Sequence, residues 1–173
     1  QKLGIDKIIK FSKDLGIYEN PSELLSISLG SSETTLLKLT SAYSAFVNGG
    51  KMVEPILIDR VQDSEGITIL NNEKRKCINC DQISFLSDKY PKIRDDYNQV
   101  FSPQTAYQIT SLLEGVVKRG TGKKLNKLKL NLAGKTGTTN ENTDAWFIGF
   151  TSSLVIGVYV GMDNPSPLGK YET

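Results

Sequence analysis

The 173-residue sequence contains no histidine, and this absence excludes several kinds of catalytic site. Ser-His-Asp and Cys-His enzymes both use an imidazole as the general base, so neither mechanism can operate with the residues of this segment alone. A typical catalytic zinc site also draws on histidine ligands. A catalytic zinc site is therefore not expected. We expect no other metal and no cofactor either.

Long apolar runs and a strong net charge are also missing. No stretch approaches the ~20 apolar residues that span a bilayer, so we expect no membrane contact by this segment. A net charge of +2 gives no reason to expect a nucleic acid as a partner. The chain opens at Gln1 without a signal peptide, and we expect it to be a piece of a longer protein with any targeting segment upstream.

Only two cysteines are present, Cys77 and Cys80 in the sequence KCINC. A zinc site would need two further ligands, and neither a second C-x-x-C nor a histidine exists to supply them. A redox pair usually follows a strand at the start of a helix, whereas this pair follows the polar run NNEKRK. We expect a loop disulfide in an oxidising compartment, with two free thiols as the main alternative.

Apolar residues at helical spacing predict three helices. The first lies within residues 3–15, and the second runs over about 33–48 with Ser31 or Ser32 as its N-cap. The third begins after a Ser102 cap, with a proline at its first helical position.

Strand signals follow a different pattern. β-Branched residues alternate with polar ones on both sides of DSEG, which predicts a hairpin, whereas 71–100 is charged, shows little periodicity and is expected to be a loop insertion. Three short strands are predicted at about 130–138, 145–150 and 154–161, joined by turns as an antiparallel meander. This order of elements predicts an α+β fold with helices packed on an antiparallel sheet.

One short motif in LNLAGKTGTTN, residues 130–140, invites two opposite interpretations. A phosphate-binding loop has the form G-x-x-x-x-G-K-[ST], because its first glycine lets the backbone N–H groups converge on the phosphates. That glycine would have to be residue 129, where Lys129 stands, and a turn and a strand rather than a helix follow the motif. The sequence therefore disfavours a nucleotide site.

The second interpretation is an edge strand that faces a substrate. Side chains alternate along a strand, so Lys135 and Gly137 fall on one side and Thr136 and Thr138 on the other. Gly137 lets a substrate backbone approach and pair with the strand, and the Thr138 N–H can then serve as half of an oxyanion hole. The structural alternative is a solvated edge strand whose lysine discourages aggregation.

Three blocks of sequence resemble the transpeptidase domain of class A penicillin-binding proteins, the bifunctional peptidoglycan synthases. The blocks are LGSSETTLLKLTSAYSAFVNGGKMVEPILI, SPQTAYQITSLLEGVVKRGTG and LAGKTGTTNENTDAWFIGFTSSLVIGVYVGMDNPSPLG. The resemblance covers nearly the whole chain and is weakest over 71–100. It implies that residues 1–173 are the C-terminal portion of one domain with the penicillin-binding/serine β-lactamase fold, incomplete at both ends.

The resemblance also implies roles for the motif. In that family a serine of an S-x-x-K motif attacks the D-alanyl-D-alanine bond, and β-lactams acylate the same serine. Lys135 would then be a catalytic residue that supplies positive potential for the substrate carboxylate and helps proton transfer. Thr136 and Thr138 would bind that carboxylate, and Gly137 would allow the close approach.

The chain departs from the family pattern, because it contains neither S-x-x-K nor S-x-N. Its nearest imitation, TLLK at residues 35–38, has the spacing of an ordinary amphipathic helix. Covalent catalysis needs the nucleophile and its base within hydrogen-bond reach. We therefore expect the nucleophile upstream, one wall of the active site here, and no complete catalysis by this segment alone.

The implied partners are peptidoglycan stem peptides ending in D-Ala-D-Ala, β-lactams and an upstream glycosyltransferase domain. The implied location is the periplasm, with attachment to the inner membrane through an upstream segment. Two alternatives of the same fold stay open. One is a non-catalytic module that binds wall peptides, and the other is a serine β-lactamase or D,D-carboxypeptidase that transfers the acyl group to water.

Residues after the motif have structural interpretations. Trp146 and Phe147 are expected to pack the strand into the sheet, with contact to the substrate as the alternative, and Asp144 is expected to anchor the preceding turn by binding backbone N–H groups. A sheet without its opening strands should leave apolar surface uncovered, so we expect this segment to be poorly stable or to associate.

Overall fold

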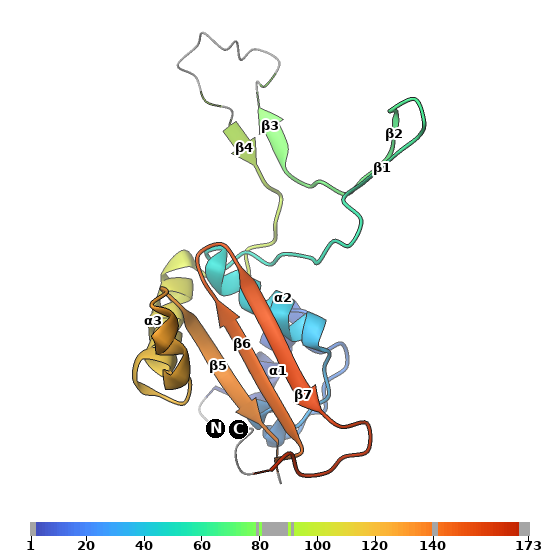
Figure 1. Cartoon of the computed structure of the whole chain (residues 1–173). Coiled ribbons are helices and arrows are strands. Elements are labelled where there is room, and N and C mark those ends of the chain that lie inside the picture. The colour runs from blue at the N-terminus through green and yellow to red at the C-terminus, as the bar shows by residue number, and fades with distance from the viewer. Residues whose placement is uncertain (1–2, 79, 81–89, 91, 140–141, 170–173) are drawn as a thin grey trace. The chain divides into compact units, whose positions relative to one another are not determined.

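The computed structural model forms two compact units, which are drawn in Figure 1. Unit 1 comprises residues 1–53 and 99–173, and unit 2 comprises residues 54–98. The residues that the structure describes are 3–78, 80, 90, 92–139 and 142–169.

The three predicted helices are confirmed in unit 1 as α1 (Ile5–Asp14), α2 (Leu36–Val47) and α3 (Pro103–Arg119). The Ser102 cap of α3 is also confirmed, because its hydroxyl accepts the Thr105 N–H at 3.2 Å. Two 3₁₀ helices that the sequence analysis did not predict, η1 (Leu25–Leu29) and η3 (Lys123–Leu128), precede α2 and follow α3.

The predicted cap of α2 is wrong. The Thr35 hydroxyl accepts the Lys38 N–H at 3.2 Å, so the helix begins after Thr35 and neither Ser31 nor Ser32 caps it. The reason lies outside the local sequence. The neighbouring Thr34 hydroxyl donates to the Ile17 carbonyl at 2.8 Å and ties the chain before the helix to the end of α1.

The predicted meander is confirmed as a three-stranded antiparallel sheet in the order β5-β6-β7. Its strands are β5 (Ala133–Thr138), β6 (Asp144–Phe150) and β7 (Val155–Gly161). Together with the helices that pack on it, this sheet confirms the α+β fold class. Strand β5 pairs with β6 alone among the described strands, so its opposite edge carries no further strand.

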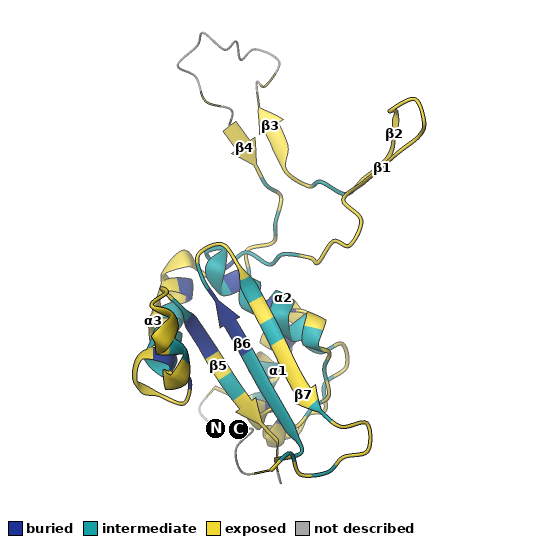
Figure 2. Cartoon of the chain, in the orientation of Figure 1, coloured by how far each residue is buried: buried dark blue, intermediate teal, exposed yellow. Residues whose placement is uncertain are grey.

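One face of this sheet packs against helices. Ala133, Ile148 and Phe150 point to that face and are almost fully buried, as the dark segments of Figure 2 show. The glycine of β7 that pairs with Ile148 lies so close to α2 that a Cβ atom on Gly157 would stand 2.0 Å from the Thr40 hydroxyl. Helix α2 therefore fixes the position of β7, while α3 lies alongside β5 (Figure 1).

The core of unit 1 continues from the sheet into the helices. Leu15 at the end of α1 packs with Ala42 and Ala45 of α2, and Phe101 joins this cluster. Phe46 of α2 stacks at 6.5 Å between ring centroids on Phe150 of the sheet. Small alanines on α2 thus allow close helix packing, and aromatic rings join the two layers.

Unit 2 contains two short hairpins. The predicted hairpin around DSEG is confirmed by the pairing of β1 (Arg60–Gln62) with β2 (Thr68–Asn71). The Asp63 carboxylate accepts the N–H groups of Glu65 and Ile67 at 2.9 and 2.8 Å, which closes the turn. Hydrogen bonds from Arg75 lower the pKa of Glu73 to about 2.

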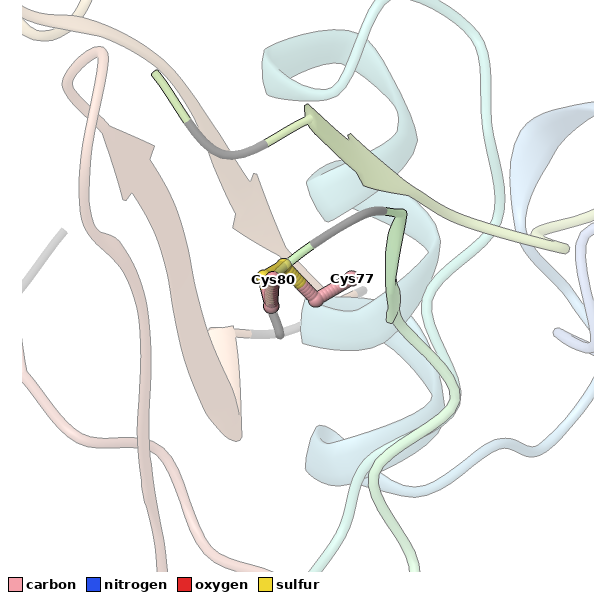
Figure 3. Close-up of a disulfide and its surroundings, with 2 residues drawn as sticks. All are labelled: Cys77 and Cys80. Carbon is pink, nitrogen blue, oxygen red and sulfur yellow. A yellow bond between two sulfur atoms is a disulfide. The ribbon is translucent and has the colours of Figure 1, made fainter. Parts of the chain in front are cut away.

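A second hairpin lies within the range expected to be a loop. Strands β3 (Lys76–Ile78) and β4 (Lys92–Arg94) pair there, a pairing that the sequence analysis did not predict. The expected disulfide is confirmed, because Cys77 and Cys80 are bonded and their Cα atoms are 5.7 Å apart (Figure 3). Residues 79, 81–89 and 91 of the expected loop lie outside the described residues.

Candidate active-site strand

The structure places all four residues of the predicted motif on β5. Lys135 pairs with Ile148 and Gly137 with Trp146 in the register of β5 and β6, so both point to the helix-covered face. Thr136 and Thr138 alternate with them and point to the opposite face. Lys135, Gly137 and Thr138 are exposed, while Thr136 is half-buried.

The backbone groups of β5 alternate between β6 and the free edge. Thr139, the residue after the strand, donates its N–H to the Asp144 carbonyl of β6 at 3.2 Å. Successive residues of a strand direct their N–H and C=O groups to opposite sides. The N–H and C=O groups of Thr136 and Thr138 therefore point to the free edge, where an added peptide strand can pair with them.

The side chain of Lys135 lies along this edge. Its ammonium group donates to the carbonyl oxygen of Thr136 at 2.7 Å, which agrees with the outward direction of that carbonyl. Among the described residues no carboxylate pairs with Lys135. Its charge is therefore available to a bound anion at the edge.

The two threonines differ in their partners. The Thr136 hydroxyl shares a 2.7 Å hydrogen bond with the Thr121 hydroxyl, from the turn after α3. This contact holds β5 to the segment that follows α3. Among the described residues, the Thr138 hydroxyl makes no such hydrogen bond to another side chain, so it is more available to a ligand than the Thr136 hydroxyl.

The turn after the motif is not anchored by the Asp144 carboxylate, as was expected from the sequence. The Asp144 carboxylate accepts the Tyr159 hydroxyl at 2.8 Å instead of backbone N–H groups. The turn itself is closed by the Thr139 hydroxyl, which accepts the Asp144 N–H at 2.9 Å. The hydrogen bond to Asp144 raises the pKa of Tyr159. The carboxylate is thus turned along the face that carries Trp146, whose ring lies 4.8 Å from that of Tyr159.

A cavity of about 500 Å³ adjoins the end of the motif, and no pattern in the sequence predicts it. It is bounded by β5 and β6 on one side and by residues 29–34, which connect η1 to α2, on the other. The lining comprises Tyr18, residues 29–34, Leu39, residues 137–139, Asp144 and Trp146. The sequence signal available for this connection was Gly30, which has a φ of 81° and permits the turn after η1.

The imitation of S-x-x-K has a structural role, as the sequence analysis expected. Thr35 is the N-cap of α2, and the ammonium of Lys38 lies 2.6 Å from the Glu19 carboxylate. Both groups are occupied by contacts that organise the start of the helix. They form no pair of nucleophile and base.

The described residues provide neither a metal site nor a membrane-spanning helix. Outside the undescribed positions, no group of three or more histidine, cysteine, aspartate or glutamate side chains is arranged to hold a metal ion. Within the same part of the chain, every helix is too short or too polar to span a bilayer.

Known proteins share both the sequence and the fold. Penicillin-binding protein 1A of Rickettsia typhi is 42% identical over 175 residues, which cover 99% of this chain and 22% of that protein. The chain thus spans about a fifth of the length of the curated relatives it matches. The crystal structure of penicillin-binding protein 1A from Haemophilus influenzae aligns with a TM-score of 0.74 and 31% identity over 98% of this chain and 28% of that one.

A more distant structure shows the fold alone. PonA1 of Mycobacterium tuberculosis in complex with penicillin V aligns with a TM-score of 0.60 and 22% identity, over 86% of this chain and 34% of that one. The family profile for the penicillin binding protein transpeptidase domain matches residues 1–173. This chain therefore belongs to the penicillin-binding protein transpeptidase family, and its predicted resemblance to the class A proteins is confirmed.

Proposed function

We propose that this chain is the C-terminal portion of a serine-type D,D-transpeptidase domain that cross-links peptidoglycan. The observation that carries the proposal is the free edge of β5, where Lys135 and Thr138 present a cation and an outward N–H in a chain of the transpeptidase family. The substrate is a stem peptide ending in D-Ala-D-Ala, which adds to β5 as a further strand.

Each group at the edge has a task in this reaction. The Lys135 ammonium attracts the terminal carboxylate and favours proton transfer, with Thr136 and Thr138 as further ligands of that carboxylate. Gly137 leaves room for the peptide backbone, since no side chain projects from it. The Thr138 N–H donates to the scissile carbonyl oxygen as negative charge develops there, which lowers the barrier to attack.

The nucleophile comes from a segment of the full-length protein outside this chain. A serine hydroxyl oxygen forms an ester with the penultimate D-alanyl carbonyl, the C–N bond breaks, and D-alanine leaves with the proton. The amine of a neighbouring wall peptide then attacks the ester and releases the serine. β-Lactams react at the same serine because their strained amide carbonyl occupies the place of the scissile bond.

The full-length protein also determines the location. We propose that it lies in the periplasm, attached to the inner membrane by an upstream segment, and that a glycosyltransferase domain precedes the transpeptidase domain in the same polypeptide. Coupling of glycan polymerisation to cross-linking in one chain would follow from that arrangement.

Labelling of the full-length protein with a fluorescent penicillin tests the proposal. We expect one covalent label per molecule, competed by unlabelled penicillin. A folded protein that binds wall peptides without acquiring the label would be the non-catalytic module instead. Product analysis separates the remaining alternatives: an added acceptor amine is incorporated by a transpeptidase, whereas a carboxypeptidase or β-lactamase returns only hydrolysed peptide or penicillin.

A further inference from the structure

A second cavity, of about 630 Å³, lies beside the start of α2, and the transpeptidase proposal does not use it. Its volume is within the range of roughly 300–1,000 Å³ that small-molecule sites have. It is lined by residues 17–22, which follow α1, by residues 31–35 before α2, and by Lys38. This α2 cavity shares Tyr18 and residues 31–34 with the cavity at the end of β5, so the two cavities adjoin.

The charges of the α2 cavity disfavour an anionic ligand. The only cation of its described lining, Lys38, lies 2.6 Å from the Glu19 carboxylate, and its hydrogen bond lowers the pKa of Glu19. A further carboxylate, Glu33, makes no ion pair with a described residue. The lining thus carries two carboxylates against one ammonium, so a phosphate or a carboxylate gains no net attraction there.

Uncommitted hydrogen-bonding groups line the cavity instead. The side chains of Tyr18, Asn20, Ser22 and Ser32 make no hydrogen bond to another described residue. They comprise an amide, a phenol and two aliphatic hydroxyls, which together offer both donors and acceptors. Burial raises the pKa of Tyr18, so its hydroxyl keeps its proton at neutral pH. These groups suit a neutral ligand that is itself rich in hydroxyl and amide groups.

A small apolar surface accompanies the polar groups. Ile17, Pro21 and Tyr18 are half-buried and belong to the same lining. A pyranose ring matches this combination, because it carries hydroxyls at its edge and C–H groups on a face that the amphipathic ring of a tyrosine can cover. An extended peptide matches it less well, since residues 17–22 and 31–35 contain no strand with which a peptide could pair.

We propose that the α2 cavity binds the neutral N-acetylhexosamine glycan that carries the peptide held by β5, an inference that rests on the proposed transpeptidase function. The terminal carboxylate of that peptide lies at Lys135, and the glycan is attached at the peptide's other end. The cavity at the end of β5 is lined by residues 137–139 but not by Lys135, and the α2 cavity adjoins it at residues 31–34. The glycan therefore lies beyond the end of the motif that is farther from Lys135.

Three N-acylated pentapeptides ending in D-Ala-D-Ala test this assignment with the full-length protein. The first carries a neutral disaccharide of N-acetylhexosamines, the second carries the same disaccharide with its hydroxyls O-acetylated, and the third carries no sugar. The measured quantity is the peptide concentration that halves the rate of labelling by fluorescent penicillin. We expect the first peptide to act at an about tenfold lower concentration than the other two, the gain that one or two net hydrogen bonds give.

Substitutions locate the advantage of the sugar in the α2 cavity. Asn20→Ala and Ser22→Ala truncate exposed side chains that do not line the cavity at the end of β5, and each should reduce the advantage to about two- or threefold. Each variant is compared with itself across the three peptides, so a change in overall labelling does not enter the ratio. Asn126→Ala truncates an exposed asparagine of η3, outside the cavity, and should keep the full advantage.

The outcomes separate this inference from the proposed function. A protein that penicillin fails to label refutes both. A labelled protein refutes the glycan site alone if the three peptides compete equally, if none competes, or if the advantage of the sugar survives both cavity substitutions. An advantage that shrinks in these two variants but not in Asn126→Ala, and that persists at high salt, supports the site, because salt screens charges and the sugar carries none.

Discussion

At Lys135 the ammonium group lies on the free edge of β5 with no carboxylate partner among the described residues. The ammonium supplies positive potential for the carboxylate of the substrate or the penicillin and favours proton transfer, and removal of one preorganised donor from an active site typically slows a reaction about 100-fold or more. We therefore expect Lys135→Ala to reduce the rate of acylation of the full-length protein by fluorescent penicillin about 100-fold. The rate is measured as label incorporated against time.

An exposed lysine of η3 gives the matched control. Lys127→Ala removes the same charge from the same unit, away from the strand edge, and should change the rate less than about twofold. If the two variants label equally fast, Lys135 has no part in acylation.

Substitution of Gly157 tests the close packing of β7 against α2, which holds the sheet in place. A Cβ atom there would meet the Thr40 hydroxyl at 2.0 Å and a methyl group of Leu36 at 2.9 Å, so α2 would have to move away from β7. Such overpacking typically costs 1–3 kcal/mol, and we expect Gly157→Ala to lower the free energy of unfolding by about 2 kcal/mol in urea titrations.

The control for this prediction lies in the middle of a helix. A Cβ atom on Gly115 of α3 would meet only the flexible guanidinium of Arg119, at 3.3 Å. Alanine is the better helix former, so Gly115→Ala should leave stability unchanged or raise it by up to about 1 kcal/mol. Equal losses from the two glycine substitutions would contradict the role assigned to Gly157.

At the scale of elements, the start of α2 supplies a prediction that distinguishes the structure from the sequence pattern. Thr35→Ala removes the observed cap and should lower the free energy of unfolding by about 1 kcal/mol. Ser32→Ala removes one of the expected caps and should change it by less than about 0.5 kcal/mol. Thermal or urea unfolding of both variants, monitored by circular dichroism, gives the comparison. A larger loss for Ser32→Ala would place the cap where the sequence suggested.

The elements that the sequence predicted correctly are those determined by neighbouring residues. Apolar spacing and a local Ser102 cap suffice for α3, and short alternating segments separated by turn residues suffice for the order β5-β6-β7. The cap of α2 could not be predicted, because several consecutive residues before the helix carry hydroxyl groups. Which hydroxyl becomes the cap depends on the hydrogen bond between Thr34 and Ile17, which are seventeen residues apart. Strands β3 and β4 have three residues each and only their pairing identifies them.

The same division applies to the candidate site. The motif of β5 is contiguous, so its four residues could be named from the sequence and their placement on an edge strand could be predicted. The residues that surround the motif in the folded chain could not be predicted. The cavity joins residues 29–34 to residues 137–139, which lie about a hundred positions away in the sequence, and no periodicity links them. The actual partner of Asp144 is Tyr159 on the next strand, a pairing set by the register of β6 and β7.

At the scale of the whole molecule, the side of β7 that points away from the helices is exposed to solvent among the described residues. The side chains of Ile156, Val158 and Val160 alternate with the helix-facing residues of β7 and are 51, 45 and 48% exposed. Figure 2 shows the exposed positions along β7 beside the partly buried β6. Adjacent exposed β-branched residues on a strand favour association, because contact with another apolar surface removes them from water.

We therefore expect the chain to self-associate, with a mean mass that rises between about 5 and 200 µM, the range in which exposed apolar surface drives association. Val158→Lys places a charge in the centre of the exposed face and should shift the distribution toward monomer. Asn126→Lys adds the same charge in η3, away from that face, and should not. Sedimentation velocity measures the mass of all three proteins. A monomer at every concentration would show that the open face of β7 is tolerated in water, and an equal shift by both lysines would assign the association to net charge instead of to this face.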